Sequence, residues 1–216
     1  MNIMRYIRTR PLWALIILVA VYALVTALYP LFNKPLETTY CLSTALDEGI
    51  PFSRGWIVPY VSWYAFLPGV AFFLLLKDKK QCGITLLTMI SGLLLSYLTY
   101  SLFQTTVPRP AVPGDDLCSR LVQLIYNIDQ PYNAFPSIHV LATYALMLGT
   151  AKAEGIKKIA TATIWIVGWA IIISTVFVKQ HVVADILGGM VLAQVLHLVL
   201  THFLSPWLSA RWQEAN

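Results

Sequence analysis

Long apolar segments alternate with short polar ones along this chain of 216 residues. Six apolar runs occupy residues 12–32, 57–76, 83–103, 136–152, 159–179 and 181–203. A transmembrane α-helix needs about 20 mostly apolar residues, and the charged residues here fall largely between the runs. The fourth run is the shortest, so its length also suits a buried helix. The pattern predicts an all-α fold: a polytopic membrane protein in which one domain, residues 1–216, forms a bundle of six transmembrane helices.

The composition excludes an ordinary soluble domain. Hydrophobic residues make up 58% of the chain and charged residues only 12%, whereas roughly a quarter of the residues of soluble domains are charged. The first run is long and lacks a small-residue cleavage site, which favours a retained span over a cleaved signal peptide.

The distribution of Lys and Arg predicts the orientation, because cytoplasmic loops of membrane proteins carry more of them. One side of the predicted bundle holds Arg5, Arg8, Arg10, Lys77, Lys79, Lys80, Lys152, Lys157, Lys158 and Arg211. The other side holds only Lys34, Arg54, Arg109, Arg120 and Lys179. Both termini are therefore predicted to be cytoplasmic, with loops 33–56 and 104–135 outside. This topology explains most of the net charge of +5, and no nucleic-acid partner is expected.

Three cysteines are present. Cys41 and Cys118 fall in the two outward loops, where disulfides can persist. The sequence leaves open whether they are bridged, because it does not show whether their α-carbons approach closely enough. Cys82, at the start of the third run, is expected to be a small apolar packing residue.

Asp185 is the only acidic residue inside a long apolar run. A carboxylate at membrane depth is costly, so it marks a functional site for which a partner should be sought. His181 lies four residues earlier, on the same face of the predicted helix. The pair is therefore the first candidate for chemistry.

Two further polar segments are predicted at the same membrane surface as this pair. They are Gln104–Pro110, after the third run, and Asn133–His139, which opens the fourth. The orientation rests on Lys and Arg alone, yet it brings these segments and Lys179–Asp185 to one side. This agreement favours a single shared site.

The first two segments supply groups that suit an anion. Pro136 fits the first turn of a helix, where Asn133, Ser137 and free backbone N–H groups form an anion site favoured by the helix dipole. Arg109, held between two prolines, presents a guanidinium fork suited to a phosphate.

The remaining groups suit group transfer. His181 with Asp185 reproduces a nucleophile and the carboxylate that orients it. His139, just inside the fourth helix, is placed to protonate a leaving oxygen. Together with the anion site, this inventory describes phosphoryl transfer through a phosphohistidine.

Each feature also has an ordinary structural interpretation. A lone intramembrane histidine is usually a satisfied core residue, which is how we interpret His197 and His202. A Pro-flanked Arg is usually a turn, and Pro-Ser at a helix start is usually a cap. A facial triad of two His and one Asp could hold a metal, but it would leave Arg109 and the anion site without a purpose. The coincidence of all these groups on one side favours the active-site interpretation.

These residues resemble the type 2 phosphatidic acid phosphatase superfamily of six-helix membrane enzymes. Its signature has an Arg-Pro segment, a Pro-Ser-x-His segment and a Ser-Arg-x5-His-x3-Asp segment. The match covers about half the chain, within a motif-bearing core of residues 83–203. The resemblance implies that His181 is the nucleophile, Asp185 its partner and His139 the acid. It also implies that Arg109 and Ser137 bind phosphate and that no metal or organic cofactor is expected.

The chain departs from this signature at three positions. The usual Lys seven residues before the Arg is Leu102, the usual Gly between Ser and His is Ile138, and Thr175 replaces the Arg of the third segment. Two of three expected cations are therefore missing, and Lys179 is a candidate replacement for one of them. The departures resemble the branch that contains fungal inositol phosphorylceramide synthases and their bacterial relatives.

The leading hypothesis is a lipid phosphatase that acts on a lipid phosphate or diphosphate, with the membrane lipid as substrate. The alternative is a transferase that moves a phospho-headgroup to another lipid, since both reactions need the same phosphohistidine step. A third hypothesis is a non-catalytic transporter or lipid-binding protein in which Asp185 relays ions. The expected location is a bacterial plasma membrane, with the site on the extracytoplasmic side. The oligomeric state is not predicted.

Three minor features complete the expectations. Segment 41–50 has apolar residues at helical spacing, which suits either an amphipathic gate for lipid entry or a plain surface loop. Trp56, Tyr60 and Trp63 are expected to anchor the second span at the interface. The pair Gly188-Gly189 is expected to permit close helix packing.

Overall fold

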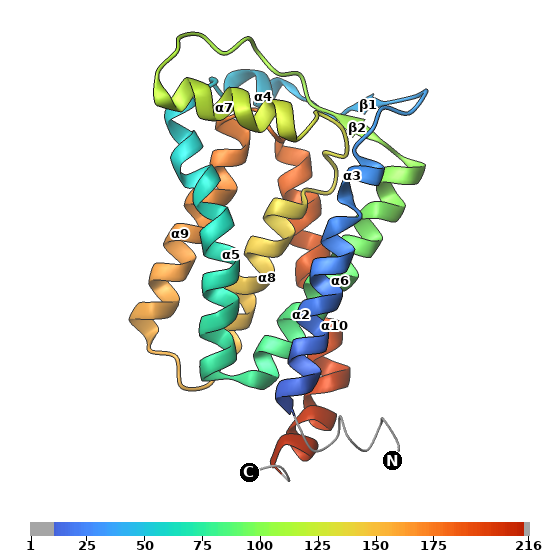
Figure 1. Ribbon diagram of the computed structural model, residues 1–216, viewed down its shortest axis with the longest axis vertical. Helices are drawn as coiled ribbons and strands as arrows, with labels where there is room; N and C mark the ends of the chain where they lie inside the picture. Colours follow the sequence, from blue (N-terminus) through green and yellow to red (C-terminus); the bar gives the residue numbers. More distant parts are fainter. Residues whose placement is uncertain (1–10, 214–216) are drawn as a thin grey trace.

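Six long helices lie side by side in the computed structural model, which describes the backbone of residues 11–213 and the side chains of residues 12–204 (Figure 1). They are α2 (Pro11–Ala27), α5 (Ile57–Lys77), α6 (Lys79–Leu102), α8 (Ile138–Lys152), α9 (Lys158–Phe177) and α10 (Val183–Gln213). The start of α2 and the end of α10 lie at the same end of the bundle. The prediction of a helical bundle is confirmed.

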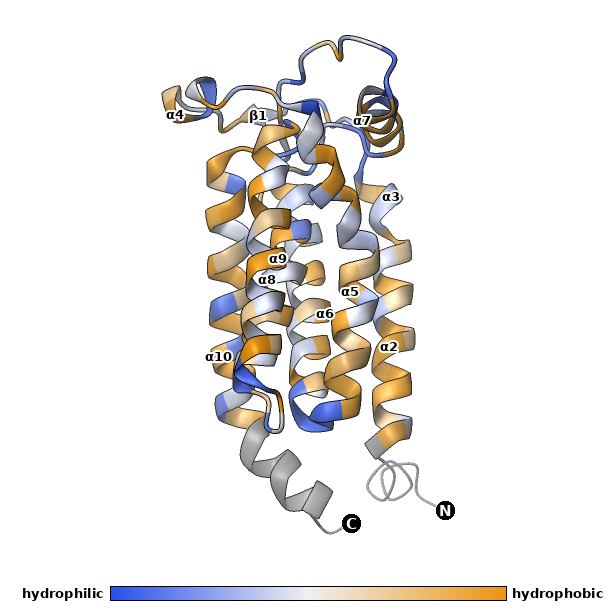
Figure 2. Cartoon of the chain, turned by 90° about the vertical axis from the view of Figure 1, so that its left-hand side faces the viewer, coloured by the Kyte–Doolittle hydropathy of each residue, from blue (hydrophilic) through white to orange (hydrophobic). Residues whose placement is uncertain are grey.

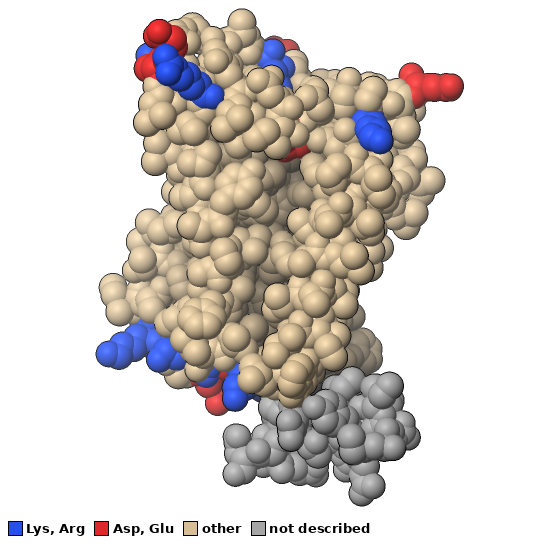
Figure 3. Space-filling model, in the orientation of Figure 1, with Lys and Arg blue, Asp and Glu red and all other residues tan. Residues whose placement is uncertain are grey.

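Five segments are long and apolar enough to cross a membrane, among the residues that the structure describes. They are Leu12–Phe32, Arg54–Lys77, Lys79–Leu102, Lys158–Phe177 and Val183–Leu204. The fourth apolar run forms α8, which has only 15 residues, so a sixth span stays a prediction. Apolar residues dominate the helical part of the bundle (Figure 2). Charged side chains on the face in Figure 3 gather at its two ends. The chain is therefore an integral membrane protein.

Helix α8 occupies the centre of the bundle, where it packs against α5, α6, α9 and α10. Most of its residues are buried, and Leu141 and Leu146 are fully buried in the main core cluster with Met89 of α6. Cys82 belongs to the same cluster, as expected for an apolar packing residue. Helix α2, by contrast, packs mainly on α6, and much of its surface is exposed.

Short elements cover one end of the bundle, which we call the site end. They are α3 (Tyr29–Phe32), β1 (Tyr40–Cys41), α4 (Ala45–Gly49), the 3-10 helix η1 (Arg54–Trp56), β2 (Thr105–Thr106) and α7 (Leu117–Ile128). The two-residue strands pair in parallel, Tyr40 with Thr105 and Cys41 with Thr106. This pairing joins the two loops that were predicted on the same side.

Helix α7 is amphipathic and lies across the site end (Figure 1). The Asp116 side chain accepts hydrogen bonds from the Cys118 and Ser119 N–H groups at its start and forms an ion pair with Arg54 at 2.7 Å. Its own residues Val122 and Ile125 are buried. Cys41 and Cys118 are free thiols, so the bridge that the sequence left open is not formed.

Candidate active site

The His181–Asp185 pair forms at the start of α10. The His181 Nδ1 lies 3.3 Å from the Asp185 Oδ2, and the Asp185 side chain is fully buried. The same oxygen accepts the Val182 N–H at 2.9 Å. Asp185 stands in the first turn of α10, where the helix dipole favours a negative charge. The carboxylate is thus held in place and orients the imidazole.

The turn between α9 and α10 presents His181 to this site. Helix α9 ends at Phe177, and Lys179 adopts a left-handed conformation with φ 54°, which is uncommon for a residue with a side chain. The carbonyl of Thr175 then accepts the N–H groups of both Gln180 and His181. The tight turn therefore fixes the backbone of Gln180 and His181 and places the His181 side chain beside Asp185.

His139, in the first turn of α8, faces His181 with 5.9 Å between ring centroids. Its Nε2 lies 3.3 Å from the Tyr60 hydroxyl, and the Trp63 ring centroid is 4.5 Å from its own. The expectation that Tyr60 anchors a span at the interface is wrong, because its side chain is only 1% exposed. Tyr60 and the partly buried Trp63 instead enclose the second histidine.

The start of α8 packs directly on α10. Ser137 caps α8, with its hydroxyl 3.3 Å from the Val140 N–H. A Cβ atom at Gly189 would lie 2.6 Å from the Ser137 carbonyl oxygen, and one at Gly188 would overlap the Phe135 ring. The predicted role of the glycine pair in close helix packing is therefore confirmed.

Arg109 reaches the site from the loop after β2. Its Nη1 donates to the carbonyls of Tyr126 (3.2 Å) and Asp129 (2.7 Å), and its Nη2 donates to the Gln180 Oε1 at 2.6 Å. The guanidinium carbon lies 4.5 Å from the centre of the Tyr126 ring. Burial lowers the pKa of Arg109 from its ordinary value. These contacts fix the guanidinium beside the histidines, which with Arg109 line one small cavity.

Three N–H groups from side chains lining this cavity are buried and have no hydrogen-bond partner among the described residues: Arg109 Nε, Asn133 Nδ2 and Gln180 Nε2. A buried donor without a partner costs about 1–3 kcal/mol, so a ligand rich in acceptors would be favoured here. The oxygens of a phosphate are such acceptors. Gln180 was not among the residues predicted from the sequence.

The orientations of both amides follow from their partners, because Asn and Gln oxygens and nitrogens must be assigned from the hydrogen-bond network. The Gln180 side chain is hydrogen-bonded to the Arg109 guanidinium. Because a guanidinium can only donate, the amide oxygen of Gln180 must face Arg109. Asn133 accepts from the Gln104 Nε2 at 2.9 Å. Gln104 is itself fixed by the Leu36 N–H and the Lys34 carbonyl. The NH2 groups of Asn133 and Gln180 therefore remain as donors.

The Lys179 ammonium is engaged outside the small cavity. It donates to the carbonyls of Asp47 (3.0 Å) and Ile50 (2.5 Å). It also lines a wider cavity of about 490 Å³, together with His181 and Arg109. Its proposed role as a replacement cation stays a prediction, and these two bonds show that it holds segment 41–50.

Asp47, which the sequence did not single out, joins segment 41–50 to the start of α10. Its Oδ1 accepts the Val183 N–H at 2.7 Å, and its Oδ2 accepts the Thr44 N–H and hydroxyl. Burial raises the pKa of Asp47, but these hydrogen bonds outweigh burial, so that the pKa lies below its ordinary value of 3.8. The segment thus forms the short helix α4, fixed to the start of α10.

Asp129 is a second carboxylate that the sequence did not indicate. Its Oδ1 accepts the Tyr29 hydroxyl at 2.7 Å and the Asn33 Nδ2 at 2.9 Å. Burial raises the pKa of Asp129 above its ordinary value, although both hydrogen bonds oppose the shift. The residue lines the small cavity and also a larger apolar groove beside it.

The metal alternative has no preformed cluster in this arrangement. Among residues 12–204, no group of three or more His, Cys, Asp or Glu side chains is arranged to hold a metal ion. Asp185 instead contacts the Nδ1 of His181 at 3.3 Å, and the His139 ring lies 5.9 Å from the His181 ring between centroids.

The fold and this end of the bundle define a helical membrane protein with two facing histidines, one of them oriented by a buried carboxylate. The chain belongs to the PAP2 superfamily, whose family model matches residues 82–208. The match runs from α6 into α10 and includes every predicted site residue. Members of this superfamily are generally phosphatases or phosphotransferases. Searches of curated proteins and of solved structures found no significant match.

Proposed function

We propose that this protein is a membrane lipid phosphatase that hydrolyses a lipid phosphate or diphosphate through a phosphohistidine. The observation that carries the proposal is the contact of His181 with two groups at the site end. Asp185 orients His181, and the His139 ring faces the His181 ring with 5.9 Å between their centroids, so that in this proposal both imidazoles act on one phosphoryl group. Superfamily membership supports the reaction class.

In the first step, the Nε2 of His181 attacks phosphorus, because its Nδ1 is engaged by Asp185. The bond between phosphorus and the lipid oxygen breaks, and His139 donates a proton to that oxygen. The product is a phosphorylated His181 and a free lipid alcohol, or a lipid monophosphate from a diphosphate. In the second step, water attacks phosphorus and gives a proton to His139. The bond between phosphorus and the His181 Nε2 breaks, which restores the His181 imidazole and releases inorganic phosphate.

The phosphate is held by Arg109, the Ser137 end of α8, Asn133 and Gln180 in this proposal. The two amide NH2 groups and the Arg109 Nε are buried donors without partners. Donors fixed in advance stabilise the charge that develops on phosphoryl oxygens. Neutral amides therefore supply part of what the missing Lys and Arg supply in the family signature, and Lys179 lines the wider entrance.

We further propose that the site faces the extracytoplasmic side of a bacterial plasma membrane, with both termini in the cytoplasm. The bias of Lys and Arg toward the opposite end of the bundle supports this orientation. A thiol probe that cannot cross the membrane tests it in intact cells. It should label the exposed Cys41 without permeabilisation, and labelling only after permeabilisation would reverse the orientation.

A headgroup transferase resembling inositol phosphorylceramide synthase is the second candidate. The cavity of about 490 Å³ beside His181 is lined partly by polar side chains, among them Asp47, Glu48 and Lys179. It has room for an alcohol that would attack the phosphohistidine in place of water. Both candidates use the same first step and differ only in the acceptor.

One assay separates these functions. Purified protein in nanodiscs is given a lipid with radiolabelled phosphate, with and without a polyol acceptor such as inositol. Release of inorganic phosphate supports the phosphatase, and label on the acceptor supports the transferase. If neither product forms, the result supports a non-catalytic lipid-binding or transport role.

The nucleophile is tested by His181→Ala, with His202→Ala as the control because His202 is exposed on the same helix. We expect His181→Ala to abolish turnover and acid-labile labelling of the protein, and His202→Ala to retain both. Normal turnover in His181→Ala would refute the mechanism. Chelators should leave the rate unchanged, and inhibition reversed by a divalent metal would instead support the facial triad.

A further inference from the structure

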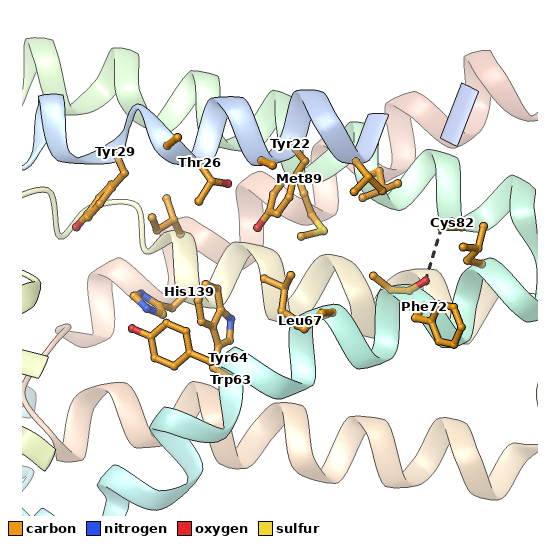
Figure 4. A pocket seen from close by; sticks show the side chains of 18 of the residues that line it. Tyr22, Thr26, Tyr29, Trp63, Tyr64, Leu67, Phe72, Cys82, Met89 and His139 are labelled. Atoms are coloured by element: carbon orange, nitrogen blue, oxygen red, sulfur yellow. Dashed lines mark hydrogen bonds between the residues drawn. The ribbon is translucent and has the colours of Figure 1, made fainter. Parts of the chain in front are cut away.

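An apolar groove runs along the bundle between α2 and α5 (Figure 4). Its volume is about 960 Å³. Apolar side chains of α2 and α5 form its two walls. The α2 wall is lined by Leu12, Leu15, Ile16, Val19 and Ala23, and the α5 wall by Leu67, Pro68, Ala71, Phe72 and Leu75. Leu86 and Met89 of α6 lie at its floor. Such a lining suits hydrocarbon and offers little to a polar ligand.

The groove exists because its two walls pack on different partners. Helix α2 packs mainly on α6, whereas α5 packs on α8 and α9. The walls carry small residues, including Ala23 and Ala71, which leave space between them. Helices α2 and α5 both precede residues 82–208, which match the superfamily. The groove is therefore built largely from the part of the chain that the match does not cover.

One end of the groove lies beside the proposed phosphate site. His139 and Asp129 line both the groove and the small cavity that contains His181. In Figure 4, His139, Trp63 and Tyr29 lie toward one end, and Cys82 and Phe72 toward the other. A chain attached to a phosphate at His181 would thus enter the groove directly.

The groove is longer than one leaflet. Helix α2, with 17 residues, is about 25 Å long at a rise of about 1.5 Å per residue. The groove is lined from Leu12, near the first residue of α2, to Tyr29, just beyond its last. One leaflet contributes about 15 Å, half of a hydrocarbon core of about 30 Å. An acyl chain that ends at the bilayer midplane would fill only part of this length.

We infer that the groove binds the tail of the lipid phosphate substrate, and that this tail is a single hydrocarbon chain longer than one leaflet. The inference rests on the proposed function, because the phosphate at His181 fixes the head of the chain. Transfer of a chain from lipid to an apolar groove brings little hydrophobic gain, since lipid tails are equally apolar. The groove therefore selects by length and shape, through packing contacts along its walls.

The first experiment blocks the groove at two depths, because Ala23 is four residues from the end of α2 at the site end and Ala71 is fourteen residues from the start of α5 there. Ala71→Trp and Ala23→Trp place a large ring in the groove from opposite walls, and Ala65→Trp is the matched control because Ala65 is exposed on α5 and does not line the groove. Phosphate release is measured for single-chain lipid phosphates of increasing chain length. Chains so short that they end above Ala23, the blocked position nearer the phosphate site, serve as the internal reference.

We expect wild-type kcat/KM to rise until the chain is longer than one leaflet. The groove variants should lower kcat/KM for these long chains about tenfold, a loss of the size expected when extra volume is forced into filled space, and should leave the short chains unchanged. Ala65→Trp should match the wild type at every length. An equal loss at all lengths, or no loss in either groove variant, would overturn the inference.

The second experiment does not depend on turnover. His181→Ala protein is mixed with a long-chain lipid phosphate that carries a diazirine at the tail end, irradiated and digested for mass spectrometry. We expect crosslinks near Leu12, Leu75 and Cys82, which line the far end of the groove, and their loss in Ala71→Trp. Crosslinks at these residues, combined with no turnover by the wild type, would overturn the proposed phosphatase activity but still support the groove as the binding site of the tail. Crosslinks spread over the outer surface of the bundle, as for bulk lipid, would overturn the groove.

Discussion

The Ser137 N–H donates a hydrogen bond to the Asp185 carbonyl oxygen at 3.1 Å. This bond joins the start of α8, which carries His139, to the first turn of α10, which follows His181. The two helices also touch directly at this point, because Gly189 lies against the Ser137 carbonyl. The spacing of the two histidines therefore depends on how closely the two helix starts pack.

Replacement of Gly189 should disturb this spacing. The Cβ of Gly189→Ala would lie 2.6 Å from the Ser137 carbonyl oxygen, which is backbone and cannot move aside cheaply. We expect a loss of about 1–3 kcal/mol in the free energy of unfolding and a large loss of kcat. Gly69→Ala is the matched control, because nothing lies within 4 Å of a Cβ there. Thermal unfolding in detergent and phosphate release measure both effects, and equal behaviour of the two variants would contradict the argument.

Gln180→Ala should weaken phosphate binding. The change removes one unpartnered donor and also frees the Arg109 Nη2 from its bond at 2.6 Å. We expect kcat/KM to fall about 10- to 100-fold, as for the loss of one or two hydrogen bonds to a charged group, and inhibition by inorganic phosphate or vanadate to weaken in parallel. Gln123→Ala, at an exposed position of α7, should change neither. A loss of activity with unchanged vanadate inhibition would assign Gln180 a purely structural role.

The helices and the meeting of the three polar segments could be predicted from the sequence, because apolar length and Lys/Arg bias act along the chain. His139, His181 and Asp185 each stand in a segment with its own local pattern. Asn133 and Arg109 could be chosen because they lie within two of the three polar segments. Superfamily membership followed from the same residues.

The remaining contacts depend on packing between distant segments. Tyr60 belongs to an apolar run, and only the fold brings its hydroxyl to His139. The Gln180 side chain becomes a directed donor only after Arg109 arrives from another loop. Asp129 and Asp47 come from loops at the site end, and charged residues in such loops are usually solvated. The groove between α2 and α5 results from the choice of packing partners, which hydropathy alone does not encode.

Asp47 should make stability depend on pH. Its pKa in the folded protein lies below the ordinary value of 3.8, so its carboxylate binds protons less readily when folded. The stabilisation is therefore complete above about pH 3.8 and is lost as the pH falls through the folded pKa. Near pH 7 we expect Asp47→Asn to lower the free energy of unfolding by about 1–2 kcal/mol, with a smaller difference near pH 3. Asp115→Asn, at an exposed loop position, should have the stability of the wild type at either pH. If the stability difference between Asp47→Asn and the wild type grew as the pH fell, the lowered pKa of Asp47 would be refuted.

Lys179 has two possible roles that kinetics and stability separate. As a phosphate ligand, its loss would raise KM for substrate and weaken vanadate inhibition. As the residue that holds Asp47 and Ile50 through their carbonyls, its loss would instead lower thermal stability and release α4. The two carbonyl bonds favour the second outcome for Lys179→Ala, with a loss of about 1–3 kcal/mol in the free energy of unfolding. Lys179→Arg keeps the charge, so partial recovery of KM in this variant without recovery of stability would instead support the phosphate role. Unchanged activity, affinity and melting temperature in both variants would exclude both roles.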